Sequence, residues 1–398
     1  MLARPPLSLY VHVPWCVKKC PYCDFNSHEF GSHSALPEKE YVAALCADFD
    51  KDYGRACLGN DLPRPIHSIF IGGGTPSLFS GESFNTLLQH IARTQAPGWL
   101  ESDGLEITLE ANPGTLEAGR FADYRAAGIN RLSLGIQSFD DAQLLRLGRI
   151  HDSAQAHRAI ESVRTAGFTN FNLDLMHGLP EQTLDSALKD INTALAFEPT
   201  HLSWYQLTIE PNTVFFSRPP PLPRESLLTS VQDAGHARLS AAGFEQYEVS
   251  AYARSTATQS QHNLNYWQFG DYIGIGAGAH GKLTVSDSAL PVRTRKQRQP
   301  DHYLRGALTE PLSFAAQDNA IAADEIAIEF LLNSLRTRHG FSVRDFEART
   351  GAGFESIQSV VERLIERSLL TQYEDPEKRI TTTEKGFRYL NNVLEEFL

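Results

Sequence analysis

Six short apolar segments alternate with helix-like segments over the first half of the chain, and this alternation constrains the fold more than any other feature. The expected strands are 7–13, 67–71, 105–109, 131–135, 170–175 and 201–207. The expected helices between them are 38–52, 81–94, 116–127, 152–166 and 182–196. Strands that alternate with helices in this way pair into a parallel sheet whose faces are covered by the helices.

Polar residues occur where several of these strands end. Glu110, Gln137 and Asp174 lie at or just after the carboxyl end of an expected strand. Periodicity alone does not separate an open doubly wound sheet from a barrel, but in barrels the carboxyl ends of the strands form the functional face. We therefore predict an α/β fold with a full or partial (β/α) barrel of the TIM type.

The alternation ends near residue 300. Helical patterns at 323–337, 343–350 and 354–367 precede a strand-turn-strand pattern around 374–376 and a closing helix at 384–397. These features predict a barrel domain over 1–300 and a small, helical, winged-helix-like accessory domain over 301–398. No basic recognition helix is evident in it, and the formal charge of −12 argues against a protein that coats nucleic acid. No apolar run reaches the roughly 18 residues that a membrane-spanning helix needs.

Three cysteines, Cys16, Cys20 and Cys23, follow the first expected strand. Thiolates at this Cys-x3-Cys-x2-Cys spacing can hold three corners of a cuboidal 4Fe-4S cluster, because iron prefers thiolate sulfur and the loop is short enough to wrap one cluster. The fourth iron then has no protein ligand. S-adenosylmethionine could chelate there through its amine and carboxylate.

Two other readings of these cysteines remain open. A structural zinc knuckle would need His12 or His28 as its fourth ligand. A disulfide framework is disfavoured, since five cysteines in 398 residues are sparse and no secretory signal peptide is evident. Unpaired thiols and an oxygen-sensitive cluster predict a cytoplasmic location.

Further polar and glycine-rich positions could bind such a cosubstrate. The loop Gly72-Gly73-Gly74-Thr75 follows an expected strand, and its backbone can approach an amino group closely, although a tight structural turn explains it as well. Carboxylates and amides suit an ammonium or a ribose, and an arginine suits a carboxylate. The residues that could act so are Glu110, Gln137, Arg149 and Asp174, and a barrel-capping ion pair is the alternative for each.

The segment His262-Asn263-Leu264-Asn265-Tyr266-Trp267 joins a histidine to two large aromatic residues. Such a set could give an axial nitrogen and apolar walls to a macrocycle such as heme. On the residues alone, an aromatic core patch around a hydrogen-bonded histidine is favoured. The cations at 293–298 are expected to be a solvated surface.

Four motifs together carry a resemblance to a known family. They are Tyr10 to Cys16, Cys20 to Phe25, Gly72 to Ser77 and Arg131 to Ser138. The chain from about residue 7 to 281 resembles the coproporphyrinogen dehydrogenase-like branch of the radical S-adenosylmethionine (SAM) superfamily, and the remainder resembles that branch's accessory domain. The branch contains an oxygen-independent coproporphyrinogen III dehydrogenase and a heme chaperone.

Two features favour the chaperone over the dehydrogenase. The dehydrogenase has a further cysteine where this chain has Phe25, and a longer arm than the 15 residues that precede Cys16. The chaperone has a His-Asn-x-x-Tyr-Trp motif, which 262–267 matches at every named position. The resemblance thus reverses the preference for a core patch and predicts His262 as the heme-side residue, whereas the dehydrogenase stays the alternative.

The resemblance also implies cofactors, partners and site residues. It makes Cys16, Cys20 and Cys23 the cluster ligands and implies reductive cleavage of SAM as the chemistry of the fold, without assigning a catalytic residue. Its implied partners are heme and a heme-accepting protein, such as a respiratory-chain hemoprotein, and it leaves open a homodimer and a peripheral membrane contact. The residues that it places around SAM are Tyr10, Tyr22, Gly74, Thr75, Glu110, Gln137, Arg149 and Asp174.

Overall fold

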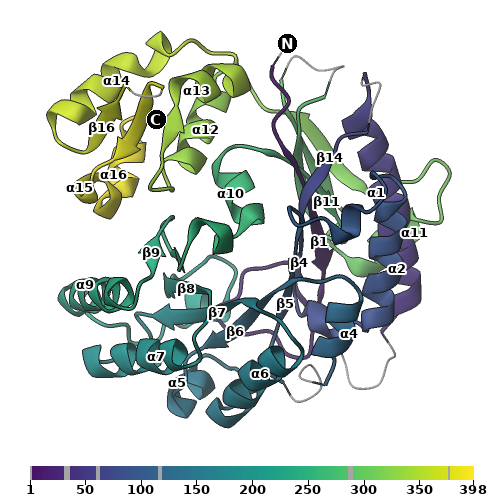
Figure 1. The fold of residues 1–398 in the computed structure, drawn as a ribbon, viewed down its shortest axis with the longest axis horizontal. Coiled ribbons are helices and arrows are strands. Elements are labelled where there is room, and N and C mark those ends of the chain that lie inside the picture. Colours follow the sequence, from purple (N-terminus) through teal and green to yellow (C-terminus); the bar gives the residue numbers. More distant parts are fainter. Residues whose placement is uncertain (1, 31–35, 60–62, 115–118, 286–289, 375–376) are drawn as a thin grey trace.

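The computed structural model describes the chain except residues 1, 31–35, 60–62, 115–118, 286–289 and 375–376. Figure 1 shows a strongly curved sheet with helices along its outer face and a smaller unit beyond one end of the curve. Helix α10 lies on the inner side of the sheet, between the sheet and the smaller unit.

Six parallel strands form the centre of the sheet, and they are the six that the sequence predicts. In spatial order they are β1 (Leu7–Val13), β4 (Ile66–Gly73), β5 (Glu106–Ala111), β6 (Arg131–Gln137), β7 (Asn170–His177) and β8 (His201–Gln206). Most of their residues are buried, as expected when helices cover one face and the interior of a barrel is filled.

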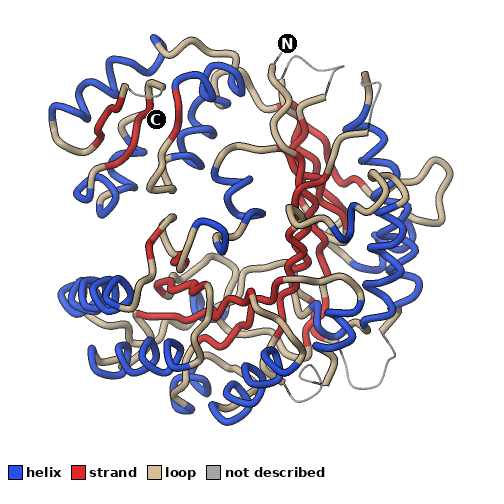
Figure 2. Tube along the Cα trace, in the orientation of Figure 1, coloured by secondary structure: helices blue, strands red, loops and turns tan. Residues whose placement is uncertain are grey.

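Helices connect these strands on the outer face (Figure 2). Two of them start with capping boxes, in which the side chains of Asp152 and Thr183 accept from backbone amides of the first turn. Part of the expected helix 116–127 lies outside the described residues. The outer helices are α1 (Glu38–Cys57), α2 (Gly81–Ala92), α4 (Phe121–Ala126), α5 (Asp141–Arg146), α6 (Ser153–Thr165), α7 (Leu184–Ala196) and α9 (Glu225–Ala241).

Further strands extend the sheet at both sides. Strand β11 (Asp271–Ile275) is parallel to β1, and antiparallel strands continue from β11 and from β8. The end strands β14 and β9 pair with no further strand among the described residues, so the barrel is partial and its sheet is mixed. The added strands are β12 (His280–Leu283), β13 (Val292–Lys296) and β14 (Ala315–Ala320) on one side, and β10 (Ala251–Ala253) and β9 (Glu245–Gln246) on the other.

The C-terminal unit has its own core, which consists of residues from Ile321 onward together with Phe269. Strand β14 and helix α11 (Pro300–Gly306), which contacts α1, lie beyond residue 300 but pack with the large sheet. The polar, mostly exposed side chains of β14 hide it from a hydrophobic pattern, so the expected boundary at residue 300 differs from the limits of this core. A three-stranded sheet provides the expected wing. The unit's elements are α12 (Ile326–Ser334), β15 (Phe341–Ser342), α13 (Val343–Thr350), α14 (Glu355–Glu366), β16 (Leu370–Tyr373), β17 (Arg379–Thr382), α15 (Glu384–Arg388) and α16 (Leu390–Glu395).

Helix α10 (Gln261–Trp267) was not predicted from the sequence. The side chain of Ser260 caps it by accepting from the amide of Asn263. It contacts β1, β4, β11 and α12, and thus touches both units. Its aromatic residues obscure the helical period, because side chains on several of its faces are in contact with protein. No helix in the described parts of the chain has the length and apolar character that crossing a bilayer requires.

Candidate functional site

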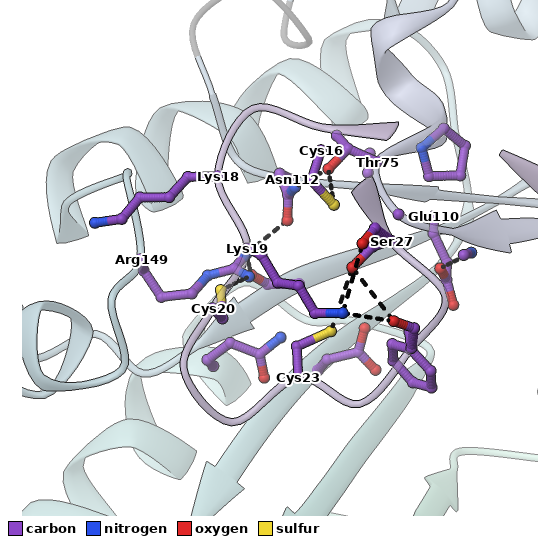
Figure 3. Close-up of a pocket in the computed structure, with 18 of the residues that line it drawn as sticks. Cys16, Lys18, Lys19, Cys20, Cys23, Ser27, Thr75, Glu110, Asn112 and Arg149 are labelled. Carbon is purple, nitrogen blue, oxygen red and sulfur yellow. Dashed lines mark hydrogen bonds between the residues drawn. The ribbon is translucent and has the colours of Figure 1, made fainter. Parts of the chain in front are cut away.

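The three cysteines of the predicted cluster loop line one pocket at the carboxyl ends of the parallel strands (Figure 3). The pocket has a volume of about 360 Å³. The loop starts at β2 (Trp15–Cys16), which pairs with β3 (His28–Glu29), so the chain turns back on itself around the thiols. Each sulfur has its own polar neighbour: the Thr75 hydroxyl lies 3.5 Å from Cys16 Sγ, the Arg149 guanidinium 3.6 Å from Cys20 Sγ, and the Ser27 hydroxyl 3.9 Å from Cys23 Sγ.

The surroundings of the thiols fit an iron–sulfur cluster. Burial raises the pKa of Cys16 and of Cys23, so these groups need a bound cation to be held as thiolates. No three His, Cys, Asp or Glu side chains among the described residues converge on a single ion. A cuboidal cluster would place these three thiolates at three separate corners.

The histidines that a zinc knuckle would need are engaged elsewhere. His12 Nδ1 lies 2.9 Å from the Tyr10 hydroxyl, and its Nε2 lies 2.9 Å from the carbonyl oxygen of Asn26. His28 Nε2 lies 3.2 Å from the carbonyl oxygen of Arg298. With both ring nitrogens of His12 in hydrogen bonds, this arrangement offers no zinc ligand at that position.

The glycine loop after β4 is bound directly to the cluster loop. The amide of Gly74 donates to the carbonyl of Val13 at 2.8 Å, and that of Thr75 to the carbonyl of Trp15 at 2.7 Å. A Cβ atom on Gly74 would lie 2.5 Å from the Trp15 carbonyl oxygen, so only glycine permits this approach. The loop therefore positions Cys16 as well as the floor of the pocket.

Two partly buried carboxylates face the same pocket. Glu110 accepts from the amide of Gly73 at 3.1 Å, and burial, followed by repulsion from Asp174, raises its pKa to about 8. Burial also raises the pKa of Asp174, against hydrogen bonds from Asn172 and Ser133 that lower it. Two neighbouring carboxylates in such a pocket favour a positively charged ligand.

Hydrogen bonds join Arg149, Asn112 and Thr75 along the wall of the pocket opposite these carboxylates. Arg149 Nη2 donates to Asn112 Oδ1 at 2.5 Å, and Asn112 Nδ2 donates to the Thr75 hydroxyl at 3.0 Å. The buried Nε of Arg149 has no hydrogen-bond partner among the described residues, so it is available to an anionic group. Gln137 has a left-handed backbone with φ of 70°, and its side chain accepts from the Tyr205 hydroxyl at 2.6 Å. Such local strain is typical of functional sites.

The pocket includes most of the predicted cosubstrate residues. Those that line it are Tyr22, Gly74, Thr75, Glu110, Gln137, Arg149 and Asp174. Tyr10 does not line it and instead lies between His12 and the ring of His262, with 6.3 Å between the Tyr10 and His262 ring centroids. Sequence reasoning missed Asn112, which could have been recognised as a polar residue just after β5, and Tyr205, which carries no comparable signal.

His262 lies deeper in the barrel, at 1% exposure, and it does not line the pocket. Its ring stacks on Phe70 at 5.2 Å and meets Tyr266 edge-on at 4.8 Å. Nδ1 lies 3.3 Å from the Ser68 hydroxyl, whereas the buried Nε2 has no partner within the described structure. Burial lowers the pKa of His262 to about 3, so the imidazole is neutral and keeps a free lone pair.

The sequence predicted that the cations at 293–298 form a solvated surface. This prediction fails for part of the segment. Lys296 is buried at 2% exposure, and its ammonium contacts Asp48 and Asp52 on α1. Arg293 pairs with Glu329 of the C-terminal unit. Lys296 therefore links its strand to α1, and Arg293 links the same strand to the C-terminal unit.

Comparisons with known proteins agree with this geometry. A family model described as the radical SAM superfamily matches residues 10–194, and one described as the HemN C-terminal domain matches residues 321–389. The solved structure of coproporphyrinogen III oxidase (HemN) from Escherichia coli superposes with a TM-score of 0.78 over 99% of this chain and 90% of that one. At 22% identity this match establishes the fold alone.

Relatives of higher identity define the family. The heme chaperone HemW of Escherichia coli K12 is 48% identical over the full length of both chains. The heme chaperone HemW of Haemophilus influenzae is 46% identical over 99% of this chain and 98% of its own. The heme chaperone HemW of Bacillus subtilis is 33% identical over 98% of this chain and 99% of its own. The chain therefore belongs to the HemW family of heme chaperones within the radical SAM superfamily.

Proposed function

We propose that this protein binds heme and passes it to an acceptor protein, and that it carries a 4Fe-4S cluster on Cys16, Cys20 and Cys23 with SAM chelated beside it. Full-length similarity to proteins named heme chaperones carries the proposal. The acceptor we expect is a hemoprotein, such as one of the respiratory chain, and the expected location is the cytoplasm.

The pocket has the groups that this cosubstrate needs. When bound, the reduced cluster supplies an electron to the sulfonium of the chelated cosubstrate. Glu110 and Asp174 provide negative charge for its cationic groups, and Arg149 Nε provides a donor for its carboxylate. The cysteine loop and the glycine loop hold these groups in one rigid frame.

Phe25 supports the chaperone over the dehydrogenase. It stands at the position of the further cysteine that the resemblance assigns to the dehydrogenase, and it is 63% exposed at the edge of the pocket. An exposed phenylalanine adds an apolar surface there and cannot coordinate iron. Coproporphyrinogen oxidation remains the outcome that a functional test must distinguish.

We propose His262 as the axial heme ligand. Its neutral ring and unpartnered Nε2 suit iron coordination, and the neighbouring rings of Phe70 and Tyr266 suit a flat macrocycle. Because His262 is 1% exposed, ligation requires helix α10 to move away from the sheet. We infer that heme binding is coupled to such a movement.

An anaerobic heme titration tests the proposal. The iron-reconstituted protein is titrated with heme and followed by Soret absorbance, in parallel with His262→Gln and His177→Gln. His177 is the matched control, because it is likewise buried and has a pKa lowered by burial, to about 4, and a nitrogen without a partner in the described structure. We expect saturation near one heme per chain, weakened at least tenfold by His262→Gln only.

Other outcomes of this titration would decide against the proposal or its site. Equal heme affinity in His262→Gln and wild type would refute the ligand assignment. Absence of heme binding in wild type, together with decarboxylation of coproporphyrinogen under reducing conditions, would refute the chaperone function in favour of the dehydrogenase.

A further inference from the structure

A continuous chain of hydrogen bonds runs from the cosubstrate pocket to helix α10. Asn172 Nδ2 donates to the Asp174 carboxylate at 2.8 Å, and Asn172 Oδ1 lies 2.6 Å from His201 Nδ1. His201 Nε2 lies 2.8 Å from the Tyr247 hydroxyl. That hydroxyl accepts from the amide of Ser260, the capping residue of α10, at 3.2 Å. The four residues beyond Asp174 are buried, with exposures of 0–2%.

The donors and acceptors of this chain have one consistent direction. Burial lowers the pKa of His201 well below its usual range, so the ring is neutral and has one N–H. Nδ1 must carry that hydrogen, because it faces the side-chain amide oxygen of Asn172, which can only accept. Nε2 then accepts from the Tyr247 hydroxyl, whose oxygen accepts from Ser260. Every donor therefore points toward Asp174, and such chains strengthen one another in a dry interior.

The same end of α10 has a second attachment to the barrel. Glu106 Oε1 on β5 accepts from the amides of Gln261 and His262 at 2.9 and 3.3 Å. Arg131 Nε lies 3.7 Å from the other carboxylate oxygen. The first turn of α10 thus cannot move without breaking buried hydrogen bonds at both attachments, which is costly unless other partners replace them.

Tyr247 also connects to the C-terminal unit. Its backbone carbonyl accepts from the amide of Arg338 at 2.9 Å. The Arg336 guanidinium of the same segment lies 4.8 Å from the centre of the Trp267 ring, at the other end of α10. Tyr247 is therefore connected to the pocket through His201 and Asn172, to α10 through Ser260 and to the accessory unit through Arg338.

We infer that Tyr247 is a positioning residue, which links Asp174 in the SAM pocket to the helix that carries His262. Through this link SAM and heme influence each other's binding. The inference rests on the proposed function. A cationic cosubstrate beside Asp174 favours the ionised carboxylate, which is the acceptor at which the chain of donors ends. SAM therefore holds α10 against the sheet, and heme affinity falls when SAM is bound.

A linkage experiment tests the inference on the full chain with its cluster reconstituted and kept oxidised, so that SAM stays intact. Heme is titrated with and without saturating SAM, in wild type, Tyr247→Phe and Tyr252→Phe. Tyr252 is the matched control, because it is buried at 2% exposure and its hydroxyl has no hydrogen-bond partner among the described residues. SAM titrations with and without heme provide the reciprocal measurement.

We expect SAM to raise the heme Kd of wild type and of Tyr252→Phe by about fivefold or more, the lower end of common coupling strengths. Heme should raise the Kd of SAM by the same factor, as linkage requires. In Tyr247→Phe both effects should fall below twofold while each ligand still binds. A general structural role of the hydroxyl would lower stability without removing this coupling.

The outcomes separate the inference from the function on which it rests. A wild-type heme Kd that does not rise with SAM, or a rise that Tyr247→Phe retains in full, overturns the positioning role and leaves heme binding established. Absence of heme binding in wild type under both conditions overturns the function and the inference together.

Discussion

Replacing Glu110 with glutamine should stabilise the ligand-free protein at neutral and alkaline pH while weakening cosubstrate binding. Burial and the nearby Asp174 raise the pKa of Glu110 to about 8. In the unfolded chain the group titrates near its ordinary value of about 4.5. Between these two values the unfolded state has already lost the proton that the folded state keeps, so the carboxyl makes folding less favourable as pH rises.

The size of the effect follows from the two pKa values. A pKa of about 8 in place of 4.5 corresponds to about 5 kcal/mol, since each tenfold change in acidity is worth about 1.4 kcal/mol. The full cost is present above pH 8, and about 3 kcal/mol of it at pH 7. Glutamine cannot ionise, and its amide oxygen can still accept from Gly73. The variant should therefore be more stable than wild type by about these amounts, and the difference should vanish well below pH 4.5.

Urea unfolding of the cluster-free proteins, followed by circular dichroism at pH 5, 7 and 9, measures the difference. Glu161→Gln is the control, because Glu161 is exposed on α6 and loses the same charge. A Glu110→Gln variant that is no more stable than wild type at pH 9, or an equal gain in Glu161→Gln, would show that the carboxyl is not held in an unfavourable environment. The reasoning about the pocket's need for a cation would then fail.

Three further predictions address the site and its frame. Gly74→Ala should abolish cluster incorporation, measured as iron per chain, because the added Cβ would lie 2.5 Å from the Trp15 carbonyl oxygen. The control Gly104→Ala should retain the cluster, because its Cβ would have no atom within 4 Å. SAM affinity, measured by calorimetry, should rise up to about tenfold per pH unit from pH 6 to 8 and level off above, because the cation binds the ionised form of Glu110, whose pKa is about 8. Lys296→Met should destabilise the protein by about 3–5 kcal/mol in thermal unfolding, since it leaves buried carboxylates unpaired; an unchanged Tm would contradict this ion network.

The central strands and their helices were predictable because their signals are local. A buried parallel strand is an apolar run, and an amphipathic helix repeats its apolar residues every three to four positions. The antiparallel strand β14 was not predictable in this way, since its side chains are largely exposed and it is specified by its pairing with β13. Helix α10 was not predicted for the opposite reason. Its side chains contact protein on several sides, so no single apolar face repeats along the helix.

The sequence by itself determined the central β/α alternation, the spacing of the three cysteines and the family motifs, because each of these depends on residues that are near one another in the chain. Only the tertiary structure decided that Asn112 and Tyr205 complete the pocket, that both nitrogens of His12 are engaged, and that His262 is buried between α10 and the sheet. The link from Asp174 to Ser260 likewise joins residues from four separate segments. Such contacts depend on how strands and helices pack in space, and no local pattern specifies them.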